Sequence, residues 1–296
     1  MISSVQTSWA ALLGNPNSGK TAIFNLLTGL NHKVSNYPGV TVEKKTGLAR
    51  FAAGDQFNIL DLPGTYSLTP ESMDERIVTE QVLNWIHGHE PPDVIISVVD
   101  ATNLSRNLYL TSQLADLGIP IVVALNMMDM VKQDLNINYE KLANDLDVAA
   151  IIPMSATEKW GQSELLESIK KSMNSNVVEN PFPIFLNDDI SNALKPLEEM
   201  LKTQFRYNNR LAKAQALRLI TRKSTVEIYT EMSANGMIVD AAFKKSLQEK
   251  RVAAVDILEN TGIKHRIMEA TLRYEWLDSV LATGNINIES NIEEYN

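Results

Sequence analysis

The sequence contains no cysteine among its 296 residues, so disulfide bridges and cysteine-ligated metal centres are excluded. This composition favours an intracellular location. Histidine is also scarce: there are four, and only His87 and His89 lie close together. They precede a Pro-Pro turn and have no third ligand nearby in the sequence, which favours solvent-exposed loop histidines over a metal site.

Long apolar runs are missing as well. The longest runs, such as residues 119–125, are far shorter than the roughly 20 residues that a membrane-spanning helix needs. The amino-terminal stretch MISSVQTSWAALLGN has neither the basic start nor the apolar core of a secretory signal. We therefore expect the chain as given to be soluble.

The chain has no excess of positive charge. Its net charge is −9; residues 1–179 carry 12 Lys+Arg against 20 Asp+Glu, and residues 180–296 carry 15 against 16. Neither half has the basic surplus of a nucleic-acid-binding protein, so we expect no nucleic-acid partner. Any phosphate group must be held by local geometry.

Hydrophobic patterning predicts an α/β fold in the first part of the chain. Near-continuous apolar runs rich in β-branched residues at 94–101 and 119–126 are typical of central strands in a parallel sheet. Helical apolar spacing between such runs indicates a mostly parallel, doubly wound sheet, whose ligands bind at the carboxyl ends of the strands.

Helical patterns dominate the rest of the chain. We therefore predict a nucleotide-binding domain over residues 1–175 and an all-helical domain over residues 176–284. The polar segment 285–296 is expected to be a disordered tail.

The stretch GNPNSGKT at 14–21 fits the phosphate-binding pattern G-x-x-x-x-G-K-[ST]. It follows a predicted strand and opens a predicted helix, so backbone amides can surround phosphate groups. Lys20 is expected to reach the β- and γ-phosphates and Thr21 to offer its hydroxyl to Mg²⁺. The alternative is a glycine-rich turn with a solvated lysine. The predicted phosphate-binding residues are Gly14, Asn15, Pro16, Asn17, Ser18, Gly19, Lys20, Thr21 and Ala22.

A second motif, DLPG, comprises Asp61, Leu62, Pro63 and Gly64 at the end of a predicted strand. We expect Asp61 to hold Mg²⁺ through water and the Gly64 amide to contact the γ-phosphate. Alone, this tetrapeptide is an ordinary turn. Its position some forty residues beyond the phosphate-binding stretch favours a role in nucleotide binding.

The motif NMMD follows the predicted strand at 119–126 and contributes Asn126, Met127 and Asp129. A carboxylate accepts hydrogen bonds from N1–H and the exocyclic amine of guanine, whereas adenine offers no such donor pair, which favours GTP over ATP. The alternative is a pair of helix-capping residues. Ser155, Ala156 and Thr157 end another predicted strand, where a backbone amide can meet guanine O6.

Two loops are predicted to be nucleotide-dependent switches. The first is the stretch 32–43, in which Gly39 and Val40 precede Thr41, whose hydroxyl and carbonyl could reach Mg²⁺ and the γ-phosphate. The second follows Gly64 over residues 65–76.

GNPNSGKT, YPGVTVEKK, DLPGTYSL, NMMD and SAT, in this order, resemble the cytosolic amino-terminal region of the ferrous iron transporter family FeoB. The likeness is dense over residues 9–173 and weaker through the helical part, which in the family acts as a guanine-nucleotide dissociation inhibitor domain. The resemblance implies a Ras-like GTPase fused to a membrane-embedded Fe²⁺ permease, at the cytoplasmic face of the bacterial inner membrane. That permease portion is absent from this chain, which is expected to be either an excised cytosolic portion or a soluble relative. Self-association into a homo-oligomer is left open.

The chain differs from Ras-like GTPases at Thr65, where a glutamine would position the attacking water. The family likeness implies that switch-loop backbone groups and a potassium ion replace it, with Asn17 as the potassium ligand. A turn-forming role for Asn17 is an equal alternative. The residues expected to take part in hydrolysis are Asn17, Lys20, Thr41 and Gly64.

Met127 stands where many GTPases carry a lysine that packs on the base, so we expect weak nucleotide affinity and quick GDP release. Two rival functions are a ribosome- or tRNA-associated GTPase, which should carry a basic RNA-binding module, and a sensor that binds GTP without hydrolysing it.

Overall fold

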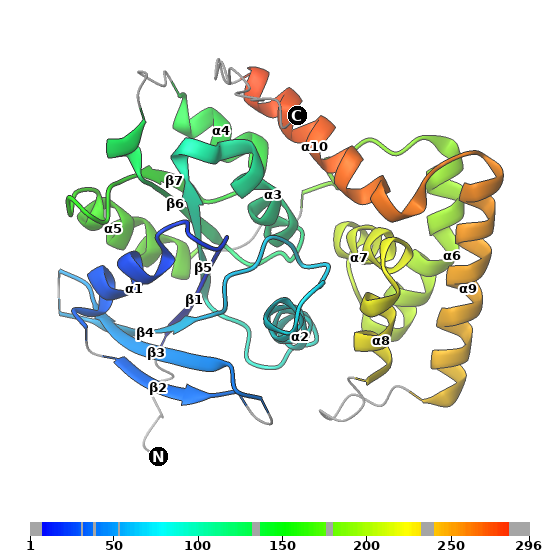
Figure 1. Ribbon diagram of the computed structural model, residues 1–296, viewed down its shortest axis with the longest axis horizontal. Coiled ribbons are helices and arrows are strands. Elements are labelled where there is room, and N and C mark those ends of the chain that lie inside the picture. The colour runs from blue at the N-terminus through cyan, green and yellow to red at the C-terminus, as the bar shows by residue number, and fades with distance from the viewer. Residues whose placement is uncertain are drawn as a thin grey trace, which may run out of the picture.

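The computed structural model describes residues 8–30, 32–37, 40–52, 54–131, 137–175, 180–231 and 240–283. Its centre is a seven-stranded sheet with the order β2-β3-β4-β1-β5-β6-β7 (Figure 1). The strands from β4 to β7 are mutually parallel, whereas β2 and β3 run antiparallel to their neighbours. The strands are β1 (Trp9–Gly14), β2 (His32–Asn36), β3 (Glu43–Arg50), β4 (Gln56–Asp61), β5 (Val94–Asp100), β6 (Ile121–Asn126) and β7 (Ala150–Pro153).

Helices cover both faces of the sheet because apolar side chains alternate along the strands. In β1, Ala10 and Leu12 join the apolar cluster of α1 and α5, whereas Ala11 and Leu13 join the cluster of α2, α3 and α4. These helices are α1 (Lys20–Thr28), α2 (Met73–Ile86), α3 (Leu104–Ala115), α4 (Tyr139–Leu146) and α5 (Gln162–Met173).

The later elements are all helical, which together with the sheet confirms the predicted fold class. Side chains of Asn187, Asn208 and Asp240 cap the starts of α6, α7 and α9 by accepting backbone N–H bonds. The helices are α6 (Asp188–Phe205), α7 (Asn209–Thr221), α8 (Lys223–Glu231), α9 (Ala241–Asn260) and α10 (His265–Thr283).

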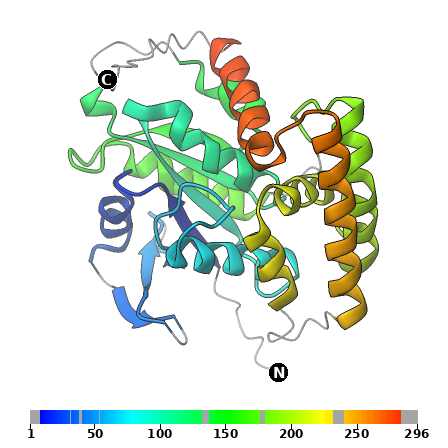
Figure 2. The ribbon, with the colours of Figure 1, turned by 45° about the vertical axis from the view of Figure 1, so that its right-hand side comes forward.

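The helical part lies against the α2 and α3 side of the sheet, and α10 runs back across α3 and α4 (Figures 1 and 2). One apolar cluster continues from Leu108 in α3 through Leu217 in α7 to Leu277 in α10. The helices are therefore packed onto the sheet layer through a shared core. None of the helices in the described ranges combines the length and apolar character that crossing a bilayer requires.

Two local expectations are wrong. Residues 32–36, expected within a loop, form strand β2, whose residues are all exposed at the edge of the sheet. His87, expected to be solvent-exposed, caps α2 and is half-buried because its ring stacks on Tyr207 and packs near Phe205 of the helical part. His89 is exposed.

Candidate nucleotide-binding site

The predicted site residues gather at the carboxyl edge of the parallel strands. β1 leads into residues 14–19 and α1, and β4 ends at Asp61 beside it. Two backbone bonds hold the strand ends in register: Leu62 N–H donates to the Leu12 carbonyl (3.1 Å) and Thr65 N–H to the Gly14 carbonyl (3.2 Å). The DLPG turn is thereby fixed beside the phosphate-binding stretch.

The turn before α1 depends on unusual backbone angles. Asn17 has φ of 66° and Gly19 has φ of 84°, both in the left-handed region. A Cβ on Gly19 would lie 2.1 Å from Nδ2 of Asn126, so only glycine fits. No side chain caps α1, which leaves its first amides available to a ligand.

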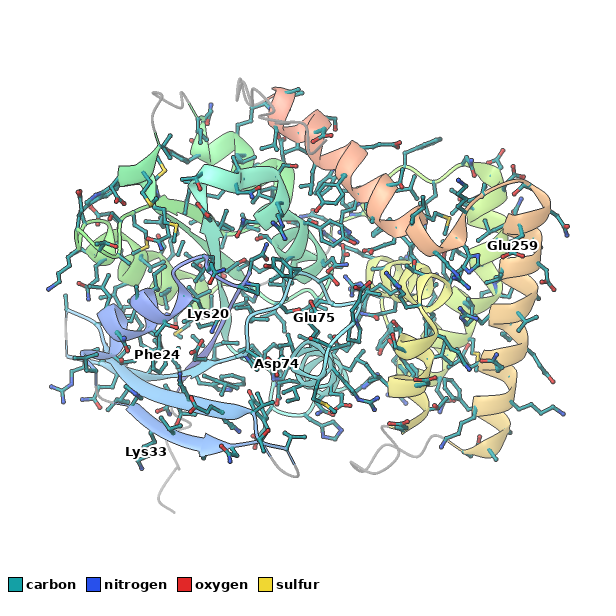
Figure 3. All side chains as sticks on the ribbon, viewed as in Figure 1. Lys20, Phe24, Lys33, Asp74, Glu75 and Glu259 are labelled. Carbon is teal, nitrogen blue, oxygen red and sulfur yellow. The ribbon has the colours of Figure 1, made fainter. Side chains whose placement is uncertain are left out.

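Lys20 and Asp61 form an ion pair across this edge. Lys20 stands at the start of α1 and points toward the sheet (Figure 3). Their side chains are 12% and 6% exposed, so each charge is largely withdrawn from water and balanced by the other. The pair puts an ammonium donor and a carboxylate acceptor at the same place.

Two buried polar atoms in the phosphate-binding stretch have no hydrogen-bond partner within the described residues: Oδ1 of Asn15 and Oγ of Ser18. Asn15 is 3% exposed, and its Nδ2 donates to the Arg106 carbonyl at 3.4 Å. Buried polar atoms normally have partners, so these atoms fit a site that receives a polar ligand.

Asn126 connects the phosphate-binding stretch with the loop after β7. Its Nδ2 donates to the Ser18 carbonyl (3.0 Å), and its Oδ1 accepts from the Ala156 N–H (3.0 Å). The residue is only 3% exposed. One amide therefore fixes the spacing of two loops that are far apart in the sequence.

Asp129 is exposed beside this connection, in a short turn stabilised by a bond from Met128 N–H to the Met154 carbonyl (3.3 Å). Ser155 pairs with Trp160 through two backbone bonds, and Thr157 is exposed in the enclosed turn. The turn thus presents the Asp129 carboxylate to solvent on a fixed backbone.

Gly64 packs against Pro16, since a Cβ there would lie 3.2 Å from the Pro16 backbone. Pro63 is partly buried, and Leu62 is fully buried. Thr65 is also fully buried, and its hydroxyl donates to the Ser67 carbonyl (2.7 Å). That hydroxyl is therefore occupied within the protein.

The structure leaves some predicted residues less closely connected. Thr21, Ala22 and Thr41 are exposed, and no hydrogen bond joins Thr41 to the phosphate-binding stretch within the described part of the chain. Val40 donates to the Tyr37 carbonyl at 3.3 Å. Gly39 lies outside the described residues.

Sequence reasoning did not single out Tyr37. It is 8% exposed, and its hydroxyl has no partner among the described residues. Burial and the nearby Asp61 carboxylate raise the pKa of Tyr37 to about 12, so it is a neutral donor. An aromatic residue within the predicted first switch, between Asn36 and Pro38, was the available signal.

Comparison with known proteins decides the family. The sequence model described as ferrous iron transport protein B matches residues 8–169. The chain belongs to this family, FeoB. The Fe(2+) transporter FeoB of Legionella pneumophila (strain Lens) is 38% identical over 253 residues, which cover 80% of this chain and 32% of that protein. The corresponding protein of Salmonella typhimurium is 46% identical over 173 residues, covering 56% and 21%. The chain thus spans about a third of the first relative's length.

Solved FeoB structures share the fold over nearly the whole chain. A crystal structure of an S. thermophilus NFeoB mutant bound to mGDP has a TM-score of 0.76 at 33% identity, covering 94% of this chain and 99% of that chain. The cytosolic domain of L. pneumophila FeoB gives 0.74 at 35% identity, covering 93% and 98%. The similarity therefore includes the helical part as well as the sheet.

Proposed function

We propose that this chain is the GTP-binding and GTP-hydrolysing regulatory part of a ferrous iron transporter. The observation that carries the proposal is the pair of hydrogen bonds made by the Asn126 side chain, which link Ser18 in the phosphate-binding stretch to Ala156. Asp129 lies in the next turn, so a guanine base recognised by its carboxylate has its phosphates directed toward Lys20. The nucleotide-bound NFeoB relative supports this assignment.

The phosphate groups are assigned to the amides at the start of α1, to Lys20 and to the Gly64 amide. The exposed hydroxyls of Thr21 and Thr41 and the carboxylate of Asp61 are hard oxygen donors of the kind that Mg²⁺ prefers, so these residues fit the ion. When bound, Mg²⁺ neutralises phosphate charge. Lys20, already paired with Asp61, orients the same carboxylate.

We further propose that Asn17 contributes its side-chain oxygen to a potassium ion. Asn17 is exposed at the apex of the turn and forms no side-chain hydrogen bond within the described ranges. A monovalent cation there supplies charge stabilisation to the phosphates. Thr65 cannot replace the water-positioning glutamine with its hydroxyl, because that group is bonded to the Ser67 carbonyl.

The remaining features of the proposal concern organisation. We assign residues 1–175 to the nucleotide-binding domain and residues 176–284 to the helical domain, and place both at the cytoplasmic face of the membrane beside an iron-conducting partner region. The predicted tail at 285–296 lies outside the described residues. The near-neutral charge of residues 180–296 argues against a ribosome- or tRNA-associated GTPase.

The direct test is nucleotide binding by Lys20→Ala against Lys170→Ala. Lys170, whose side chain is 43% exposed, pairs with Asp55 and serves as the matched control. We expect Lys20→Ala to lose at least about tenfold in GDP affinity and nearly all GTP hydrolysis, whereas the control keeps both. Equal behaviour of the two variants would remove the basis of the proposal.

A further inference from the structure

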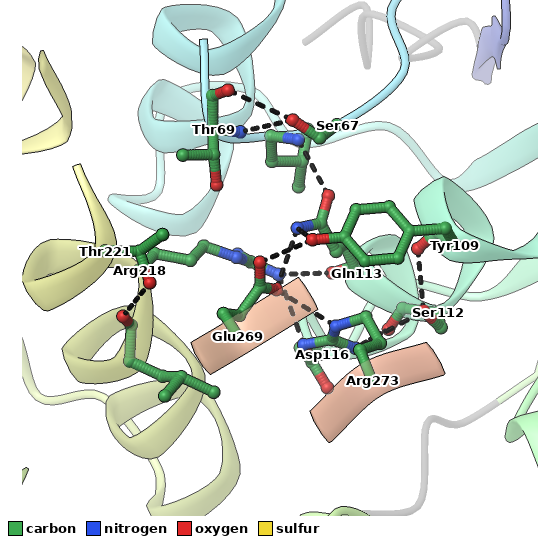
Figure 4. Close-up of polar contacts among 12 residues, drawn as sticks. Ser67, Thr69, Tyr109, Ser112, Gln113, Asp116, Arg218, Thr221, Glu269 and Arg273 are labelled. Carbon is green, nitrogen blue, oxygen red and sulfur yellow. Dashed lines mark hydrogen bonds and ion pairs between the residues drawn. The ribbon is translucent and has the colours of Figure 1, made fainter. Parts of the chain in front are cut away.

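A buried polar network joins the sheet layer to the helical part (Figure 4). It connects α3 with α7 and α10, and in it the carboxylates of Asp116 and Glu269 face the guanidinium groups of Arg218 and Arg273. Each member is at most 1% exposed: Gln113, Asp116, Arg218, Glu269 and Arg273. Asp116 also pairs with the buried Arg210. Such a network holds its members in one arrangement, since any group left unpaired is cut off from water.

Gln113 is the member that reaches the second-switch segment, residues 65–76. Its Oε1 accepts from the Leu68 N–H (2.7 Å), and its Nε2 donates to Oε1 of Glu269 (2.8 Å). Leu68 follows Gly64 and Thr65, and its carbonyl accepts from the Thr79 hydroxyl at 3.4 Å. One buried amide thus bridges α10 and the segment that adjoins the phosphate-binding stretch.

Two of the three partners of the Gln113 side chain, Leu68 and Glu269, permit only one orientation of its amide; the third, the Tyr109 hydroxyl, accepts from Nε2 at 3.4 Å. Leu68 presents an N–H, which needs an acceptor, and Glu269 presents a carboxylate, which needs a donor. Turning the amide by 180° would make both contacts repulsive. Gln113 is fully buried, so it has no alternative partner in water.

Glu269 also fixes α10. Its Oε2 accepts from the Tyr109 hydroxyl (2.6 Å), and Arg273 one turn later donates to Oε1 (3.0 Å). Burial raises the pKa of Glu269, but Arg273 and Arg218 outweigh burial, and the net shift is downward. Arg273 in turn pairs with Asp116 of α3 (2.8 Å). Displacement of Glu269 would therefore disturb the contacts that hold α10 against α3.

Contacts from the second-switch segment to Arg222, which follows α7, and to α8 are of a different kind. Glu71 pairs with Arg222, and Pro70 accepts from the Ser224 hydroxyl at 3.2 Å. The Glu71 and Arg222 side chains are 65% and 46% exposed, so water can replace their contact. The bonds of Gln113 are buried, so water cannot replace them when the segment moves.

We propose that Gln113 makes the position of the second-switch segment and the seating of α10 interdependent, so that the nucleotide at the phosphate-binding stretch alters the stability of α10. The inference rests on the proposed function. Gln113 is a positioning residue, because it acts on the segment through the Leu68 amide. By reciprocity, a change at this amide also alters the preference between GDP and GTP.

The test is hydrogen–deuterium exchange of α10 amides in the full chain, loaded with GDP or with a non-hydrolysable GTP analogue in Mg²⁺ and K⁺. In the unmodified protein we expect exchange rates in α10 to differ at least about threefold between the two nucleotides. In Gln113→Met, which keeps the volume but loses both bonds, the ratio should fall to near one.

Two controls accompany this variant. Gln215→Met replaces another buried glutamine, whose Nε2 has no partner among the described residues, and should leave the ratio unchanged. Tyr109→Phe removes the bond to Glu269 and the 3.4 Å bond from Nε2 of Gln113, but it keeps the bridge from Leu68 through Gln113 to Glu269 and should retain most of the ratio. Should Gln113→Met not fold, Gln113→Asn, which keeps the amide but shortens its reach, is measured in the same way.

Binding of both nucleotides is measured on the same samples by fluorescence titration. Equal α10 exchange rates with the two nucleotides in the unmodified protein, or a preserved ratio in the Gln113 variant, overturns the inference. If GTP still binds in that case, the proposed function stands. Failure of both nucleotides to bind overturns the proposed function first. A lost ratio in Gln113→Met that still binds both nucleotides, with a changed preference between GDP and GTP, supports the coupling.

Discussion

Replacing Asn126 by alanine removes the connection between the phosphate-binding stretch and the loop after β7. The amide makes bonds of 3.0 Å to the Ser18 carbonyl and from the Ala156 N–H, and the site is 3% exposed. Each backbone group left without a partner costs about 1–3 kcal/mol where it stays buried. Much of this cost is relieved in the free protein, since both loops can relax toward water, but ligand binding restores it.

Taking about 1 kcal/mol for each of the two groups gives about 2 kcal/mol, or a loss of about 30-fold in GDP affinity for Asn126→Ala. The assay is titration with a fluorescent GDP derivative in Mg²⁺. Asn107→Ala is the matched control, because Asn107 is 5% exposed and also bonds two backbone groups, Asn103 carbonyl (2.9 Å) and Asp100 N–H (3.4 Å), without joining the two loops. A GDP affinity within threefold of the unmodified protein for a folded Asn126→Ala would refute the reasoning.

Three further predictions follow from the site and its surroundings. GTP hydrolysis should be several-fold faster in KCl than in NaCl, and Asn17→Ala should abolish the difference; equal rates at matched ionic strength contradict the potassium assignment. Burial, with His89 adding to it, lowers the pKa of His87 to about 4. The neutral His87 therefore contributes fully to folding stability above its unfolded pKa near 6.5, and this contribution is lost as the pH falls toward 4. The free energy of unfolding measured in urea should fall by about 2 kcal/mol more between pH 7 and pH 5 in the unmodified protein than in His87→Phe, and identical decreases would contradict this. Met127 packs near Gly19. GDP release, measured by stopped-flow fluorescence, should be faster than about once per minute in the unmodified protein and slower in Met127→Lys. An unchanged release rate in Met127→Lys would contradict this assignment.

The fold class could be predicted because its signals are local. Buried β-branched runs produced β5 and β6, and the apolar spacing from Ile77 to Ile86 produced α2. Glycine at position 19 was required by a positive φ that few residues tolerate. The motifs were recognisable because strand ends, turn and helix start follow one another directly in the chain.

Other features depend on contacts between residues far apart in the sequence. Nothing near Asn126 indicates that its amide bridges Ser18 and Ala156, because both partners are backbone groups. The stretch 32–36 has little apolar alternation, and its strand results from pairing with β3. His87 is half-buried by aromatic residues more than a hundred positions away, which no local pattern predicts.

The buried network was out of reach for the same reason. Arg273 and Glu269 are one helical turn apart and look like an ordinary surface pair of α10 in the sequence. Their burial follows from Asp116 and Gln113, which come more than 150 residues earlier. Charged residues on an amphipathic helix predict a solvated face unless their partners are known.

The most direct test of the central claim is base specificity, measured as phosphate release from GTP and XTP in Mg²⁺ and K⁺. The Asp129 carboxylate accepts from both the N1–H and the amine of guanine, whereas asparagine can accept from N1–H and donate to the second carbonyl of xanthine. We predict repeated turnover of GTP but not XTP by the unmodified chain, and the reverse preference for Asp129→Asn. Hydrolysis of GTP no faster than that of Lys20→Ala, or an Asp129→Asn variant that keeps its preference for GTP, would contradict the account.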